Sequence, residues 1–334
     1  MKNKYNLRHD TRLSTVIREN RLLRAELETF KSESQRKLKA LENKLAKERR
    51  EREYYFFKNL QPDQYESALS DWFYEKTGKK LDLTDPKTYN EKLQWLKLYD
   101  STQQKADLTD KYKVRDYVRE KIGEKYLIPL LGVWDGPDDI RFDELPNQFV
   151  LKANHGCAYN IIVRDKAQMN EKAARNQIKK WLGENYAFHS LEMHYSLIER
   201  KIIAEEYIEN IGGDVFDYKV FCFGGKAKYI MFLSERKKKL KMAFYDLEWN
   251  RMPFTYSFEP LDHDIPKPDN LAELIQAAEA LAEGFPHVRV DFYILNNGEI
   301  KFGEMTFTTC SGACKWEPSE YDRILGDLIS LSKH

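Results

Sequence analysis

The sequence predicts an α+β protein built on antiparallel sheets and preceded by a long helical arm. Short β-like apolar runs follow one another between residues 149 and 302. The pairs Gly224-Gly225 and Asn297-Gly298 are turn signals, because such residues accept the positive φ of tight hairpins. Neither GxGxxG nor GxxxxGK[ST] occurs in the 334 residues, which argues against the two commonest parallel nucleotide-binding folds.

Charge and composition exclude several classes of protein. Lysine plus arginine (55) nearly balances aspartate plus glutamate (54), so no global field draws this chain onto nucleic acid. No apolar run reaches the length of a membrane span, and no cationic-then-apolar leader begins the chain. The cysteines lack paired metal-ligand spacing, so we expect reduced thiols in a cytoplasmic protein. They are Cys157, Cys222, Cys310 and Cys314.

Residues 1–53 are predicted to form a coiled-coil-like helical arm. The stretch 11–52 has no Pro or Gly and is rich in Arg, Lys, Glu and Leu. Its apolar seam has two parts separated by a polar break: Val16, Leu23, Leu27 and Phe30, then Leu38, Leu41 and Leu45. Three roles stay open: a homodimer through this helix, a solvated tether, and peripheral association of its basic residues with an acidic membrane surface.

The body is expected to have a helical and α/β N-terminal lobe at 54–135 and a larger domain at 136–334. In the first lobe we expect a helix beginning at Thr84-Asp85-Pro86, a helix over 111–121 that ends before Gly123, and a strand within 126–133. Helices are predicted over 171–182 and 270–283. Strands are predicted over 149–152, 160–163, 202–204, 218–223, 228–233, 288–294 and 299–302.

The strongest chemical signal is the hairpin over 289–306. Period two places Arg289 and Asp291 on one face of the first strand, and Glu304 and Thr306 on one face of the second. Carboxylate oxygens suit Mg²⁺ that is bound together with substrate phosphates. The alternative is a salt-bridged sheet surface.

Two weaker signals precede that hairpin. Residues 149–156 form an apolar strand that ends in Lys152 and a loop with His155 and Gly156, where a lysine and backbone amides can meet a phosphate. Residues 202–209 form an apolar strand running into paired acids, Glu205 and Glu206, which can lie beside an adenine and a ribose. Each signal alone is also explained by an ordinary strand end.

Five segments in this order resemble the TupA-like ATP-grasp family, which is associated with teichuronopeptide and bacterial surface-polysaccharide synthesis. The segments are YNEKLQWL (89–96), DKYKVR (110–115), LIPLLGV (127–133), DYKVF (217–221) and GEMT (303–306). The similarity covers about residues 85–330 and leaves the arm outside. It implies an ATP-grasp fold, in which antiparallel sheets in two lobes clasp ATP, with a lid lobe at about 136–208 and a C-terminal lobe at about 209–334.

The resemblance also implies roles for individual residues. Lys111 and Lys152 contact the ATP phosphates, beneath a lid loop at 154–159 that includes His155 and Gly156. The residues implied to bind adenine and ribose are Glu205, Glu206, Tyr207, Ile208, Glu209 and Asp217. Lys219 is also implied to bind the nucleotide. Asp291 and Glu304 bind Mg²⁺, and Arg289 stabilises the transferring phosphoryl group. Thr306 stands where many ATP-grasp ligases have asparagine, and threonine is a poorer third metal ligand.

The implied activity is that of an ADP-forming amide ligase that activates a carboxylate as an acylphosphate and couples it to an amine. Family context favours a uronic acid on a sugar nucleotide or glycan, joined to an amino acid or small amine during capsule or other polysaccharide biosynthesis. Two alternatives remain: an ATP-grasp phosphotransferase, and a non-catalytic or glycosyltransferase-associated module of a polysaccharide assembly complex.

Overall fold

The computed structural model describes residues 3–208, 216–234 and 240–331, and within 3–14 its backbone only. Two compact units make up the chain, Met1–Phe56 and Phe57–His334. Glu209 lies outside the described residues. The predicted boundaries of the arm, the N-terminal lobe and the two further lobes stay predictions.

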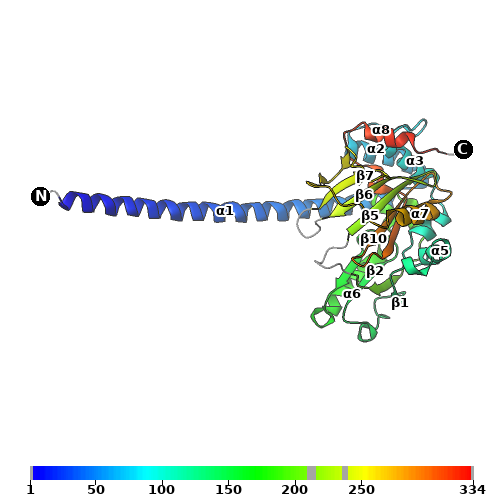
Figure 1. The fold of residues 1–334 in the computed structure, drawn as a ribbon, viewed down its shortest axis with the longest axis horizontal. Helices are drawn as coiled ribbons and strands as arrows, with labels where there is room; N and C mark the ends of the chain where they lie inside the picture. The colour runs from blue at the N-terminus through cyan, green and yellow to red at the C-terminus, as the bar shows by residue number, and fades with distance from the viewer. Residues whose placement is uncertain (1–2, 209–215, 235–239, 332–334) are drawn as a thin grey trace. The chain divides into compact units, whose positions relative to one another are not determined.

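The first unit consists of one helix, α1 (Asn3–Lys58, 56 residues), whose final residues Phe57 and Lys58 are counted with the second unit (Figure 1). The absence of Pro and Gly permits this length. Pairs one turn apart support it, such as Arg49 with Glu53 (3.3 Å) and Lys47 with Glu51 (3.9 Å). The helical arm predicted from the sequence is confirmed. No helix in the described part of the chain is long and apolar enough to cross a membrane.

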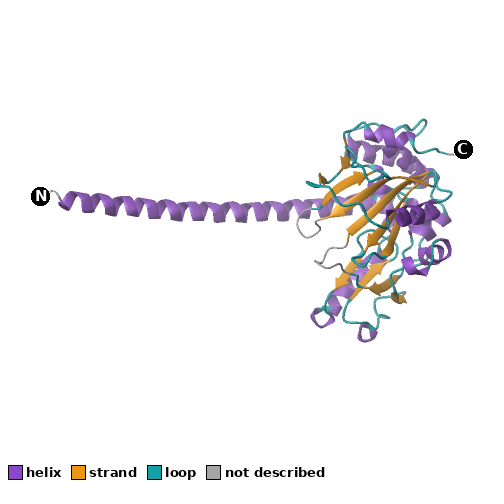
Figure 2. Ribbon diagram, in the orientation of Figure 1, coloured by secondary structure: helices purple, strands orange, loops and turns teal. Residues whose placement is uncertain are grey.

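The second unit mixes helices with antiparallel sheets, as the sequence predicts (Figure 2). Its helices are α2 (Tyr65–Thr77), α3 (Tyr89–Tyr99), α4 (Gln103–Thr109), α5 (Val114–Lys121), α6 (Glu171–Gly183), α7 (Leu271–Ala282) and α8 (Tyr321–Asp327). Its strands are β1 (Leu130–Trp134), β2 (Phe149–Ala153), β3 (Asn160–Val163), β4 (Ile202–Glu206), β5 (Phe216–Phe223), β6 (Lys226–Ser234), β7 (Lys241–Tyr245), β8 (Thr255–Tyr256), β9 (Glu259–Pro260), β10 (His287–Ile294), β11 (Ile300–Thr306) and β12 (Trp316–Glu317). Short 3₁₀ helices connect them, including η6 (Met193–Leu197) and η7 (Thr309–Gly312).

The strands form two main sheets. The four-stranded sheet has the order β1-β4-β2-β3 and is antiparallel throughout. The six-stranded sheet has the order β11-β10-β5-β6-β7-β9 and is antiparallel except where β9 pairs with β7. Strands β8 and β12 form a small separate ribbon. The long strands of both sheets match predicted ones, whereas β7, β8, β9 and β12 were not predicted.

Successive side chains of a strand point to opposite faces of its sheet. In the six-stranded sheet, buried residues lie on both faces. Val220 and Val290 pack with α5 and α7 on one face. Phe221 and its neighbours pack with α3 and α8 on the other. Arg289 pairs with Phe221 in register and therefore lies on the α3 side of the sheet. The four-stranded sheet packs against α6 through residues such as Trp181.

One helix begins later than the proline signal indicates. Helix α3 starts at Tyr89, with Thr88 as the N-cap. The Thr88 hydroxyl accepts a bond from the Glu91 amide (3.2 Å), and the Glu91 carboxylate accepts one from the Thr88 amide (2.8 Å). This reciprocal capping box satisfies two amides at once, so it sets the helix start downstream of Pro86.

Candidate active site

The predicted hairpin exists and pairs as expected. On β10 and β11, Asp291 lies opposite Glu304 and Arg289 lies opposite Thr306. The register then shifts by one residue at Gly303. A Cβ at Gly303 would lie 3.1 Å from the Asp291 carbonyl oxygen, so glycine permits the close approach of the two strands next to the carboxylates.

Asp291 is enclosed by two cations. Its Oδ1 accepts from Arg289 Nε (2.7 Å), its Oδ2 accepts from the same guanidinium (2.8 Å), and Lys219 of β5 also donates to Oδ2. Burial would raise the pKa of Asp291, but Arg289 and Lys219 hold it below its ordinary value. Asp217 is buried as well, with a carboxylate oxygen 3.8 Å from Lys219 Nζ. Asp291 is therefore an ionised carboxylate held in a fixed position.

Glu304 is the more accessible of the paired carboxylates. Its side chain is 30% exposed, against 6% for Asp291. Oε1 lies 3.4 Å from an Arg289 nitrogen and accepts a bond from the Thr306 hydroxyl (3.3 Å). Oε2 lies 3.8 Å from Lys111 Nζ. This oxygen faces a charged group of a different segment and is the open end of the cluster.

The donor set fits Mg²⁺ of the kind that is held jointly by protein and phosphate. No cluster of three or more His, Cys, Asp or Glu side chains suited to a metal occurs among the described residues. Asp291 and Glu304 supply hard oxygen ligands side by side, and Mg²⁺ commonly binds through one or two carboxylates plus substrate phosphates and water. The pair therefore suits a metal that arrives with a phosphorylated ligand.

Lys111 joins this hairpin to the loop between β2 and β3. Its backbone N–H donates to the Asn154 carbonyl (3.1 Å), and its Nζ donates to the Gly156 carbonyl (2.8 Å). The same Nζ lies 3.8 Å from Glu304. A single lysine thus brings the loop of the four-stranded sheet next to the carboxylates of the six-stranded sheet. The family resemblance assigned Lys111, the loop and Glu304 to one site, and in the structure these residues lie together.

The loop at 154–159 depends on a glycine for its shape. A Cβ at Gly156 would meet the Tyr159 ring at 2.6 Å. That ring cannot easily move, because it stacks on Trp181 with a centroid distance of 5.3 Å and its hydroxyl donates to Glu184 (2.6 Å). Side-chain packing beneath the loop therefore fixes the backbone whose carbonyl Lys111 contacts.

Replacing Gly156 with alanine is expected to lower the free energy of unfolding by about 1–3 kcal/mol, the usual cost of overpacking. It should also weaken nucleotide binding, because the loop must move away from Lys111. Gly183→Ala on α6 is the matched control, since a Cβ there meets nothing within 4 Å. Urea denaturation and nucleotide titration of both variants test this; equal behaviour of the two would contradict it.

His155 holds the loop onto α6 by its side chain. The ring is 1% exposed, with Nε2 3.0 Å from the Trp181 carbonyl oxygen and Nδ1 3.3 Å from Asn154 Oδ1. Burial lowers its pKa to about 4, so it is neutral at pH 7. A neutral imidazole has one N–H and donates to one of these two oxygens. Its burial against α6 lets it position the loop, whereas the resemblance led us to expect it among the nucleotide-binding residues.

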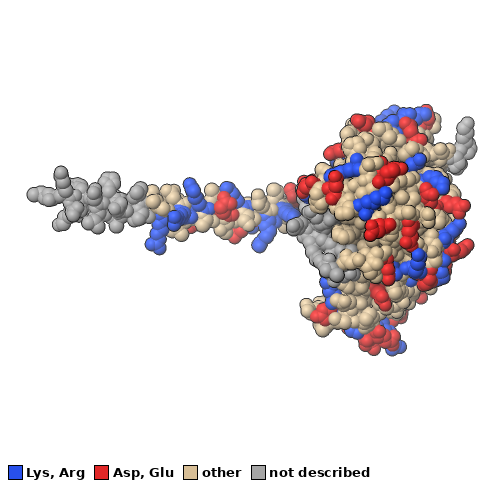
Figure 3. Space-filling view, in the orientation of Figure 1, with Lys and Arg blue, Asp and Glu red and all other residues tan. Residues whose placement is uncertain are grey.

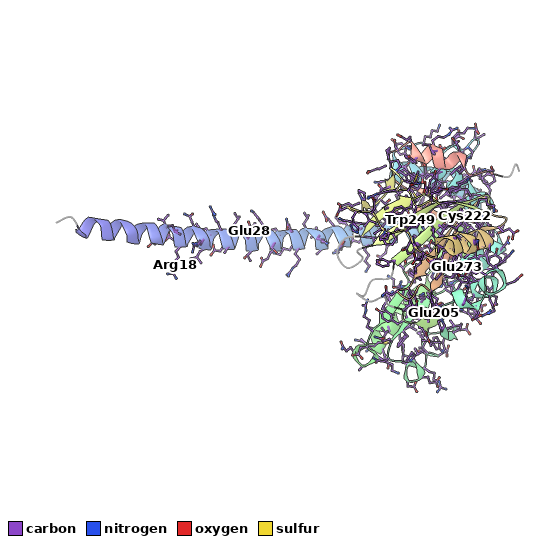
Figure 4. All side chains as sticks on the ribbon, viewed as in Figure 1. Arg18, Glu28, Glu205, Cys222, Trp249 and Glu273 are labelled. Carbon is purple, nitrogen blue, oxygen red and sulfur yellow. The ribbon has the colours of Figure 1, made fainter. Side chains whose placement is uncertain are left out.

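Lys152 and Glu205 form a buried ion pair across β2 and β4, where Figure 4 labels Glu205. Lys152 Nζ lies 2.5 Å from one carboxylate oxygen, and Arg115 NH1 lies 2.9 Å from the other. The sequence had assigned Lys152 to phosphate and Glu205 to the adenine side. Their pairing orients Lys152 and places Arg115, which carried no predicted role, in the same cluster.

The other predicted adenine-side residues follow directly along the chain. Glu206 is exposed, and Tyr207 and Ile208 are half-buried. The Tyr207 hydroxyl accepts a bond from Arg164 Nε (2.9 Å) of the segment after β3. These residues thus lie at the end of β4, beyond the Lys152–Glu205 pair.

Sequence reasoning missed a buried polar cluster around Glu192. This carboxylate is 4% exposed and accepts bonds from Ser190 (2.5 Å), Ser311 (2.9 Å) and Thr308. Lys97, fully buried on α3, donates to the Ser311 carbonyl (3.0 Å). The cluster fixes the segment that follows the Glu304 strand. Of these residues, only Lys97 stands at an unusual position in the sequence. It is a charged residue four positions after Leu93, on the apolar stripe of its helix.

The structure joins the loop of one antiparallel sheet to the paired-carboxylate hairpin of another through Lys111, as the resemblance to ATP-grasp proteins implies. The family model described as TupA-like ATP-grasp matches residues 91–330. The chain belongs to this family, and the fold predicted from the sequence is confirmed.

Solved structures similar to this chain have low sequence identity to it. The ATP complex of D-alanine–D-alanine ligase from Bacillus anthracis is 18% identical, with 66% of this chain and 65% of that one covered and a TM-score of 0.39. The ADP complex of purK, an N5-carboxyaminoimidazole ribonucleotide synthetase, is 12% identical, covering 65% and 50%, with a TM-score of 0.40. The ATP-grasp ligase PsnB with Mg and ADP is 12% identical, covering 69% and 60%, with a TM-score of 0.38. Over these three structures the chain spans between 50% and 65% of their length. No curated protein matches the chain.

Proposed function

We propose that the chain is an ATP- and Mg²⁺-dependent carboxylate–amine ligase that forms ADP, phosphate and an amide. The observation that carries the proposal is the position of Lys111, which is bonded to the lid loop at Gly156 and lies 3.8 Å from Glu304. A cation at this point sits between a loop suited to phosphate and carboxylates suited to metal. Family membership and the ligases among the solved structures support the same reading.

In the proposed reaction, a substrate carboxylate attacks the γ-phosphate of ATP, and the resulting acylphosphate is then attacked by an amine. Lys111 and Lys152 offset the charge of the phosphates, and the buried Arg289 offers a fixed positive charge to the transferring group. Mg²⁺, held by Asp291 and Glu304 with Thr306 beside them, would neutralise phosphate oxygens. The loop at 154–159 excludes water, which would otherwise hydrolyse the acylphosphate.

The nucleotide is proposed to extend from these lysines along the end of β4. Glu205, Glu206 and the backbone of Tyr207 and Ile208 lie on the adenine side. Asp217 is the described candidate for the ribose, with Lys219 next to it. For Lys152 to reach a phosphate it must share its charge between that phosphate and Glu205, and Arg115 keeps Glu205 paired when it does so.

We propose a uronic acid carboxylate, on a sugar nucleotide or a growing glycan, as the acid substrate, and an amino acid or small amine as its partner. The resemblance to a family associated with teichuronopeptide and surface-polysaccharide synthesis supports this choice. The cytoplasm is the proposed location, because sugar nucleotides and ATP meet there. The cysteines in the described part of the chain are all free thiols, as expected in a reducing compartment.

The test is to incubate the purified chain with ATP, Mg²⁺ and pools of uronic acids and amines while following ADP and free phosphate. ADP plus phosphate that appears only when both an acid and an amine are present is the expected result. ADP without free phosphate would instead identify a phosphotransferase. No calorimetric binding of ATP with Mg²⁺ would overturn the proposal.

Lys152→Ala and Asp291→Asn are expected to abolish this turnover. Asp291→Asn needs a stability control, because it leaves Arg289 and Lys219 buried beside a neutral amide. Removing one partner of a buried ion pair costs about 3–5 kcal/mol. Thermal melts of each variant must therefore accompany the assay, and full turnover by a folded Lys152→Ala would contradict the role of that lysine.

A further inference from the structure

Helix α1 carries an apolar seam with coiled-coil spacing. Taking Asn20 and Leu27 as heptad positions a places Val16, Leu23 and Phe30 at positions d. These apolar side chains are exposed, from 51% for Val16 and Leu27 to 68% for Phe30. Figure 4 shows side chains projecting from the part of this helix for which side chains are drawn, Arg18 and Glu28 among them. An exposed apolar seam of this regularity requires a partner.

Charges beside the seam indicate that the partner is a second copy of α1. In a parallel two-stranded coiled coil, each g residue faces the e residue five positions later on the other chain. Glu19 at g then faces Arg24 at e, and Glu26 at g faces Lys31 at e. Antiparallel pairing would instead set Glu against Glu and cation against cation. The charge pattern therefore favours a parallel arrangement of identical helices.

Asn20 supports the same arrangement. A single asparagine at a position a lowers stability but fixes the register and favours two strands, because only the in-register pair satisfies both amides. The residue thus specifies how two copies align.

The second part of the seam continues after a shift. Phe30 is at position d and Leu38, eight residues later, is at the next apolar position a. In an unbroken heptad repeat, position a follows position d by four residues. This insertion of four residues is a stutter, which locally unwinds a coiled coil without ending it. Leu38 and Leu45 then occupy a and Leu41 occupies d, each about equally exposed. Lys37 at g faces Glu42 at e, again with opposite charges.

We propose that the protein is a dimer in which two α1 helices form a parallel, in-register, two-stranded coiled coil with a stutter between residues 30 and 38. The inference rests on the arm alone and stands whether or not the second unit is a ligase. Contact of the same helix with an anionic membrane surface is the competing outcome.

The first test compares two adjacent leucines of α1 in the full chain. Leu23 lies in the seam and Leu22 outside it at position c, yet they are 62% and 57% exposed, so a monomer would respond alike to both changes. Light scattering should give twice 39.7 kDa for the unmodified chain and for Leu22→Asp. Leu23→Asp should dissociate at least about 100-fold more readily, because two carboxylates would face each other in the seam.

The second test fixes the direction of the two helices. Asn20→Cys should give a disulfide-linked dimer with oxidised glutathione as the oxidant, mapped by mass spectrometry to position 20 of both chains. The unmodified chain under the same conditions controls for its exposed Cys157 and Cys310. A monomer at all concentrations, including one that binds anionic vesicles, would overturn the proposal. A dimer that does not cross-link at position 20 would overturn its parallel register.

Discussion

Replacing Glu304 with glutamine is expected to slow ADP formation about 100- to 1000-fold, the range seen when one preorganised electrostatic group is lost, while leaving the fold intact. The amide oxygen can still accept the bonds that Arg289 and Thr306 direct at Oε1. What disappears is the negative charge at the open end of the cluster, 3.8 Å from Lys111. The proposed site needs that charge to hold Mg²⁺ against the phosphates.

Two measurements separate this effect from a general loss of stability. Glu299→Gln, at the exposed end of the same hairpin, removes an equal charge that pairs with Lys301 at 3.2 Å and should leave turnover unchanged. Nucleotide affinity of Glu304→Gln should be nearly independent of Mg²⁺, whereas that of the unmodified chain should rise with it. A Glu304→Gln enzyme with normal turnover would show that Glu304 is not a metal ligand.

The carboxylate hairpin was predictable because its geometry is local. Asn297-Gly298 fixes where the chain turns, and period two then fixes which side chains share a face. Gly298 has the expected positive φ, and Asp291 indeed lies opposite Glu304. The register shifts by one residue at Gly303, which lies between the Asp291–Glu304 pair and the turn, so the shift does not change how the two carboxylates pair.

Contacts between distant segments were not predictable in this way. Glu205 is bound by Lys152 and Arg115, which lie 53 and 90 residues away. The strand order of the four-stranded sheet brings Lys152 beside Glu205, whereas Arg115 comes from helix α5. Glu192 is a single acid in an irregular segment, and its partners Thr308 and Ser311 come from beyond β11. Balanced charge, by contrast, follows from composition, and acidic and basic residues are intermixed on the visible face of the second unit (Figure 3).

Mild acid is expected to destabilise the protein strongly through three buried histidines. Burial lowers the pKa of His155 and His194 to about 4 and that of His287 to about 3. Because these values lie below the ordinary value of 6.5, the folded state resists protonation that the unfolded chain accepts. Stability is complete above pH 6.5 and falls as the pH drops toward 4, by about 2 kcal/mol for each histidine at pH 5. The combined loss of about 6 kcal/mol is comparable to the whole stability of many domains.

His194 allows this effect to be assigned to a single side chain. Its Nε2 has no hydrogen-bond partner, so His194→Phe removes the titrating ring without leaving a broken bond. The ring packs beside Tyr195 (4.4 Å between centroids) and Phe307 (6.3 Å), which a phenyl group can also contact. Urea denaturation should show that the variant loses about 2 kcal/mol less than the unmodified chain between pH 6.5 and 5. Between pH 7 and 8, above the window, the difference between the two proteins should stay constant. If the two curves are instead parallel down to pH 5, the pKa of His194 is the same in the folded and unfolded states, and a carboxylate such as Glu192 must offset the effect of burial.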